Sequence, residues 1–188
     1  MAFFDKLLTG LEGISLRVVW LSGGLLILAA AIVTVDVFMR KIFGISMAGA
    51  DEITGYAFGS SIMLSLSYAL IHRSNIRIDA AYQHMPAPIR AFLDVFGMIL
   101  LVGFIGYVAW RAGFLLSDTY EYGSRAITPL RTPLAIPQTL WFSGMVFAVI
   151  TGTVLIITGL IGIFKRDWRS VSERLGIPTV DEQIKDEI

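Results

Sequence analysis

Four long runs of apolar residues, separated by charged or proline-containing segments, account for about half of the chain. The run over 53–71 contains nineteen positions without a formal charge. As a helix it would be about 28 Å long, which is enough to cross the hydrocarbon core of a bilayer. The other runs are predicted at about 18–37, 91–116 and 140–164. The pattern therefore predicts an all-α membrane protein with four transmembrane helices.

The first segment, residues 1–17, has apolar side chains at helical spacing and charged side chains on other faces. The apolar residues are Phe3, Phe4, Leu7, Leu8, Leu11 and Ile14, and the charged ones are Asp5, Lys6 and Glu12. This is typical of an amphipathic helix that lies in the membrane interface. A frayed hydrophobic terminus is the alternative. A cleaved signal peptide is disfavoured, because its positive n-region would be weak and the apolar run that follows is too long.

Lysine and arginine are unevenly distributed between the segments that flank the four runs. With four spans, the N-terminal segment, the middle turn and the tail (165–188) lie on one side of the membrane. These segments contain ten cations, and the other two turns contain four. Because cation-rich segments stay in the cytoplasm, we expect both termini to be cytoplasmic.

Composition agrees with a membrane protein that has one helical domain, residues 18–164. Charged residues make up 16% of the chain and apolar residues 55%, against about 25% charged residues in soluble proteins. Zero net charge gives no case for nucleic-acid binding. Without cysteine, disulfides, thiolate nucleophiles and cysteine-ligated metals are excluded.

Asp36 and Arg111 are charged residues inside the predicted spans. Asp36 and Arg40 are four residues apart, so they share a helix face and can form an ion pair near the end of the first span. A proton relay or a coupling-ion site is the alternative for Asp36. Arg111 can extend to the interface beside Tyr107 and Trp110. A contact with substrate is the alternative for Arg111.

The second run also contains a motif for close helix contact. Gly55 and Gly59 have GxxxG spacing, and four serines follow within nine residues. Small residues let helices approach closely in lipid, so this spacing predicts a helix-packing face without naming the partner helix.

The residues required for common membrane enzymes are not present. Both histidines, His72 and His84, fall in the middle turn, whereas a transmembrane haem or an intramembrane protease needs histidine within the spans. The chain has no GxxxxGK[ST] sequence for phosphate binding. We therefore expect no enzyme activity, no catalytic residue, no metal site and no cofactor.

Charged residues flank the second run in a particular order. An arginine ends the first span, an acidic pair opens the second, and a basic turn precedes a proline that begins the third. In chain order these residues are Arg40, Asp51, Glu52, Asn75, Arg77, Asp79 and Pro86. The order resembles that of the small membrane subunit of tripartite ATP-independent periplasmic (TRAP) transporters, the DctQ family. Two positions depart from the family pattern: Asp51 stands where glutamate is usual, and Asn75 stands where histidine is usual. The TPLAIP stretch before the fourth run is a further similarity to the family.

The resemblance implies a non-catalytic subunit of a secondary transporter in the bacterial inner membrane. In such systems a periplasmic protein captures the solute, usually a carboxylate, and a large DctM-like membrane subunit carries it with sodium. The small subunit braces the large one, so the implied partners are these two proteins and membrane lipids. By the same resemblance, Arg40, Asp51 and Glu52 would order the first periplasmic turn, and Arg77 and Asp79 the cytoplasmic turn.

The longest loop, residues 117–138, contains three prolines and should be extended and fairly stiff. It is either a simple connector or a docking surface. If it docks the solute-binding protein, its charge and side make Arg125 and Arg131 the candidate contacts.

Two other functions remain as hypotheses. One is a self-sufficient small transporter or channel that works as a homo-oligomer, with Asp36 or Arg111 as its working charge. The paired broken helices of secondary transporters are not evident in the sequence, which disfavours it. The other is an assembly factor of an unrelated membrane complex, such as an electron-transfer chain.

Overall fold

The computed structural model describes residues 2–74 and 85–176, and within these ranges the regular structure is helical. Five helices are present: α1 (Ala2–Phe43), α2 (Ala50–Ile71), α4 (Ala87–Tyr122), α5 (Ala135–Phe164) and α6 (Trp168–Leu175). The prediction of an all-α fold is confirmed for this part of the chain.

Three of the described helices are long and apolar enough to cross a membrane: Phe4–Phe43, Ala87–Tyr122 and Ala135–Phe164. Helix α2 is 22 residues long, but its serines, glycines and acidic first turn lower its hydropathy, and it is not one of the three. The structure therefore supports three candidate spans. The count of four and the cytoplasmic position of the termini stay predictions.

Helix α1 differs from the expectation of a separate interfacial helix followed by a span over 18–37. It runs without a break for 42 residues, or about 63 Å. No proline interrupts it, and isolated glycines such as Gly10 and Gly13 lower helix propensity without ending the helix. The expected boundary at residue 17 is therefore not present, and the interfacial position of residues 1–17 stays a prediction.

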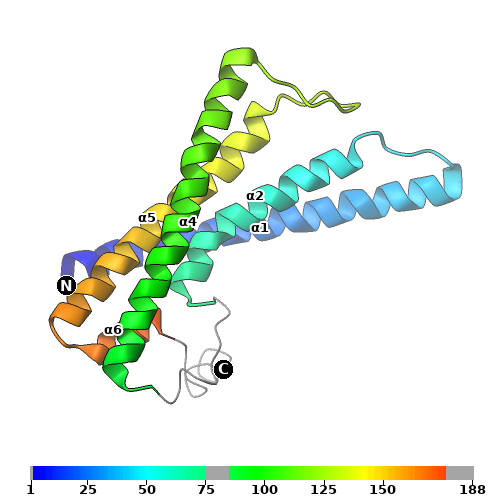
Figure 1. Ribbon diagram of the computed structural model, residues 1–188. Coiled ribbons are helices and arrows are strands. Elements are labelled where there is room, and N and C mark those ends of the chain that lie inside the picture. The colour runs from blue at the N-terminus through cyan, green and yellow to red at the C-terminus, as the bar shows by residue number, and fades with distance from the viewer. Residues whose placement is uncertain (1, 75–84, 177–188) are drawn as a thin grey trace.

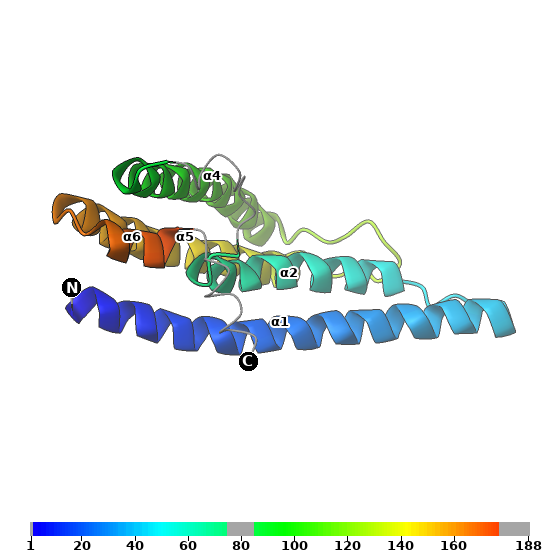
Figure 2. The same cartoon turned by 90° about the horizontal axis from the view of Figure 1, so that it is seen from below.

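The four long helices form two antiparallel pairs that cross each other (Figure 1). One pair is α1 with α2, and the other is α4 with α5. Seen after a quarter turn, α1 and α4 occupy opposite outer layers, with α2 and α5 between them (Figure 2). The short helix α6 packs against α4 and α5. Helices α2 and α5 are thus the central elements: they contact each other, α2 also packs on α1, and α5 packs on α4 and, less extensively, on α1.

Helix α5 approaches its neighbours through glycines. A Cβ atom at Gly144 would lie 2.6 Å from the backbone carbon of Met63 in α2. Gly152 faces the side chain of Val102 in α4, and Gly159 faces Leu175 in α6. The main apolar core lies around this helix and consists of Leu70, Ala91, Val95, Met98, Val102, Ala148, Leu155, Val171 and Leu175.

Small residues spaced seven apart line the buried face of α1. Ser15, Ser22, Ala29 and Asp36 are each at most 4% exposed. A seven-residue repeat keeps one seam of a helix against its partner, and here the partner is α2, where the Ser61 hydroxyl donates a hydrogen bond of 3.0 Å to the carbonyl oxygen of Ser22. This repeat is visible in the sequence.

Candidate functional site

The turn between α1 and α2 is organised by Asp36, which is 3% exposed. Its carboxylate accepts a hydrogen bond of 2.6 Å from the backbone N–H of Met47 and one of 3.3 Å from the Ser46 hydroxyl. The guanidinium of Arg40 forms an ion pair with the same carboxylate. Asp36 and Arg40 thus lie together, and their contacts hold the turn in place.

The loop between α4 and α5 packs onto this turn. Gly49, directly before α2, has a φ of 108°, a left-handed conformation that favours glycine. A Cβ atom at Gly49 would collide with the side chain of Leu130 from the loop. The two connections therefore meet at one end of the molecule and form a common surface, which we call the loop surface (residues 44–52 and 124–134).

The loop itself is folded as a short hairpin, whereas the sequence predicted an extended segment. The backbone N–H of Ala126 donates to the Thr132 carbonyl and that of Leu134 to the Ser124 carbonyl, both at 3.0 Å. Proline positions limit regular pairing, so a single isolated β-bridge joins Arg125 and Pro133 in this region.

Glu52, in the first turn of α2, lies beside the loop. Hydrogen bonding from the side chains of Thr128 and Thr132 lowers the pKa of the Glu52 carboxyl below its ordinary value, and the Tyr56 hydroxyl, 3.0 Å away, adds to this effect. Desolvation acts in the opposite direction and is outweighed. Glu52 is half-buried where two connections far apart in sequence meet, and its Oε2 has no hydrogen-bond partner among the described residues, whereas its neighbour Asp51 is exposed.

The outer part of the loop surface is basic and apolar. Arg125 and Arg131 are exposed, and the Arg125 guanidinium donates to the carbonyl oxygen of Arg131 at 3.4 Å. Ile127 between them is fully exposed. In residues 2–74 and 85–176, no group of three or more histidine, aspartate or glutamate side chains could hold a metal ion. Exposed arginines around an apolar tip are suited to contact with another protein.

Other predicted residues lie apart from the loop surface. Gly55 and Gly59 are on α2, and no other described segment comes within 4 Å of a Cβ atom built at either position. Arg111 is exposed on α4. Arg77 and Asp79, with Asn75, lie outside the described residues.

At the opposite end of the molecule is a polar cluster that sequence reasoning missed. Arg174 of α6 forms an ion pair of 2.8 Å with Asp5 of α1. His72, just after α2, lies 3.8 Å from Glu12 of α1. No local pattern could indicate these contacts, since Asp5 and Arg174 are 169 positions apart.

Long apolar helices, with charged residues concentrated at the two ends of the bundle, define a helical membrane protein. A family model described as tripartite ATP-independent periplasmic transporters, DctQ component, matches residues 29–176. The chain belongs to this family and is the small membrane subunit of a TRAP transporter. This confirms the resemblance seen in the order of charged residues. No curated protein and no solved structure matches the chain.

Proposed function

We propose that the chain braces a large DctM-like subunit in the bacterial inner membrane. The complex would take up a carboxylate-type solute together with sodium, after delivery by a periplasmic binding protein. Family membership carries this proposal. The residues support it, because the buried Asp36 bonds to its own turn and Glu52 bonds to Tyr56 of its own helix. Neither carboxylate is used to form a site for an ion in the membrane interior.

The helices favour a bracing role over independent transport. Secondary transporters bind substrate at interrupted helices near the middle of the membrane. Here α1, α2, α4 and α5 each run without interruption. The open glycines of α2, Gly55 and Gly59, leave a helix face free for close contact with another membrane helix. We propose that the large subunit covers this face.

In the proposed topology α2 is a span in addition to the three candidate spans, which gives four. Both termini then lie in the cytoplasm. Helix α2 lies between α1 and α5, so its serines need not face lipid and its low hydropathy is compatible with a span. The ten-to-four distribution of cations supports the orientation. The loop surface would then face the periplasm, where Arg125 and Arg131 could contact the binding protein.

The first test is mild extraction of the tagged chain from its native membrane, followed by mass spectrometry of the proteins that accompany it. We expect a one-to-one complex with a much larger polytopic membrane protein. A homo-oligomer without such a partner would contradict the proposal and would favour a self-sufficient transporter or channel. In that case Asp36 and Arg111 would be the first residues to substitute, with solute flux in vesicles as the measurement.

A further inference from the structure

Each of the four long helices is followed by a residue in the left-handed backbone conformation, but the residue type differs between the two ends of the molecule. After α1 and α4, at the loop surface, it is glycine: Gly44 with a φ of 67° and Gly123 with a φ of 57°. After α2 and α5, at the opposite end, it is arginine: Arg73 with a φ of 54° and Arg166 with a φ of 56°. Glycine adopts this conformation at little cost, whereas a residue with a side chain does not.

The end of α5 has the hydrogen bonds of a Schellman motif. The backbone N–H of Asp167 donates to the Gly162 carbonyl and that of Arg166 to the Ile163 carbonyl, both at 3.0 Å. Glycine is usual at the left-handed position of this motif. A cation near the end of a helix is favourable, but the preceding Lys165 already supplies one. The backbone therefore favours glycine at residue 166, and the arginine has another role.

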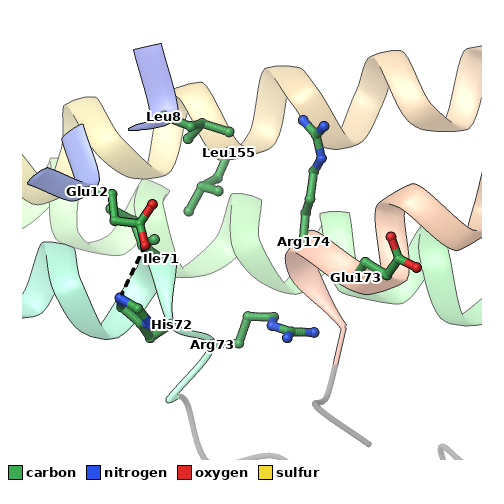
Figure 3. Close-up of a pocket in the computed structure, with 8 residues that line it drawn as sticks. All are labelled: Leu8, Glu12, Ile71, His72, Arg73, Leu155, Glu173 and Arg174. Carbon is green, nitrogen blue, oxygen red and sulfur yellow. Dashed lines mark ion pairs between the residues drawn. The ribbon is translucent and has the colours of Figure 1, made fainter. Parts of the chain in front are cut away.

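The side chains of the two arginines have different surroundings. Arg73 lines the pocket drawn in Figure 3 and extends toward α6, where its Nη1 donates to the carbonyl oxygen of Ser172 at 3.5 Å. Arg73 is thus used for a contact within the chain. Arg166 is exposed, and its side chain forms no hydrogen bond or ion pair with residues 2–74 and 85–176. Its guanidinium is available to a partner from outside these residues.

Arg166 belongs to a cationic segment at the end of a long apolar helix, which we call the α5–α6 corner (residues 164–166). Phe164 is the last residue of the 30-residue helix α5 and is 86% exposed. Lys165 and Arg166 follow directly, and both are exposed. The neighbouring carboxylate of Asp167 accepts a hydrogen bond of 3.2 Å from the backbone N–H of Ser170 and caps α6. An apolar ring followed by two cations is suited to the boundary between acyl chains and headgroups.

We propose that the α5–α6 corner binds the headgroups of anionic phospholipids. Lys165 and Arg166 would contact the phosphate oxygens, to which arginine donates with favourable geometry, and Phe164 would lie among the acyl chains. Lysine and arginine next to a membrane span are attracted to anionic lipids. An acidic protein surface would match the charge, but lipid also accounts for the exposed aromatic ring. The assignment goes beyond the bracing function and rests on α5 as a candidate span.

The test measures the melting temperature of the purified full chain in maltoside micelles, with dioleoyl phosphatidylglycerol or dioleoyl phosphatidylcholine added. A ligand that binds the folded chain raises its melting temperature, so we expect the anionic lipid to give the larger rise. Lys165→Gln combined with Arg166→Gln should reduce the difference between the two lipids at least about twofold.

The matched control removes two exposed arginines from the loop between α4 and α5. Arg125→Gln combined with Arg131→Gln changes the net charge by the same amount, and Arg131 also has a positive φ, 48°. These residues lie on a hairpin beyond the apolar helices and not at the end of a candidate span. The control should therefore leave the difference between the two lipids unchanged.

Single variants at residue 166 separate charge from backbone conformation. Arg166→Lys keeps the charge and should keep most of the response to the anionic lipid. Arg166→Gln and Arg166→Gly both remove the charge and should reduce this response equally. Without added lipid, Arg166→Gly should melt at a higher temperature than Arg166→Gln, because glycine adopts the left-handed conformation freely.

Several results would overturn the proposal. An unchanged response of the double variant to the anionic lipid would do so, as would an equal loss in the control. Equal melting temperatures of Arg166→Gly and Arg166→Gln would show that arginine has no conformational cost at this position. If the double variant loses the large subunit on mild extraction but responds normally to lipid, the corner is a protein contact. The lipid response is measured on the chain alone, so failure of the bracing function would be distinguishable.

Discussion

The glycines of α5 and those of α2 are similar in sequence but lie in different surroundings. Gly144 of α5 is so close to α2 that a Cβ atom there would lie 2.6 Å from the Met63 backbone. Gly55 and Gly59 of α2 have the better-known GxxxG spacing, yet no other described segment comes within 4 Å of a Cβ atom at either. The residues that look most like a contact motif are thus not used for contacts within the described part of the chain.

The difference follows from the positions of the two helices. Helix α5 contacts α2, α4 and α6, so its glycines shorten distances inside the chain. Helix α2 has a buried seam toward α1 and α5, formed by residues such as Ser60, Ser61 and Ser67, and an opposite face that carries the open glycines. In lipid, an open small-residue face gains most from contact with another protein. We infer that α5 holds the subunit together and α2 joins it to its partner.

The largest effect is expected at Gly144. Gly144→Val would force the α5 and α2 backbones apart, because the new side chain would meet backbone atoms that cannot rotate away. We expect destabilisation at or above the roughly 1–3 kcal/mol typical of overfilled cores. Thermal unfolding of the purified chain in detergent, read by size-exclusion fluorescence, would measure it.

Gly103→Val in α4 is the matched control, since no described neighbour lies within 4 Å of a Cβ atom at Gly103. It introduces the same side chain into an apolar helix and should change the melting temperature much less. Equal effects of the two variants would show that helix propensity, and not close contact with α2, sets the cost at Gly144.

The second prediction concerns the open face of α2. Gly55→Leu combined with Gly59→Leu should leave the thermal stability of the isolated chain nearly unchanged, because both side chains would enter open space. The amount of large subunit that co-purifies should fall at least about tenfold, since a close helix contact would be blocked. If Gly103→Leu removes the partner and the α2 double variant does not, the interface lies on α4.

Local sequence patterns predicted the helices well and their tertiary contacts poorly. Apolar runs indicated α2, α4 and α5, with their ends predicted to within six residues. The position of residues 1–17 relative to the first span was not predictable, because hydropathy changes there while helix propensity does not, and α1 continues through the change. Contacts such as Arg174 with Asp5 depend on how the chain ends meet in space.

Some contacts of the candidate site could likewise be predicted from the sequence, and others could not. The pair Asp36 and Arg40 could be read from four-residue spacing, which fixes a common helix face. The contact of Leu130 with Gly49 could not, because it joins two connections through the arrangement of two helix pairs. Glu52 was singled out by the order of charges, but its position beside Thr128 and Thr132 required the structure.

The smallest predicted effect tests the buried seam of α2. Ser61→Ala removes the hydrogen bond of 3.0 Å to the Ser22 carbonyl, and we expect a loss of about 0.6 kcal/mol, as for other hydrogen bonds between membrane helices. The loss is small because a helix carbonyl also accepts a backbone hydrogen bond within its own helix.

Ser65→Ala is the matched control, since Ser65 donates to the Ser61 carbonyl of its own helix at 2.7 Å, and this bond joins no second helix. Reversible unfolding in mixed micelles would compare the two variants. If Ser65→Ala lowers the free energy of unfolding as much as Ser61→Ala does, the hydrogen bond to α1 adds no stability and the seam is held by shape alone. The contrast between the two faces of α2 then depends on side-chain size and not on polarity.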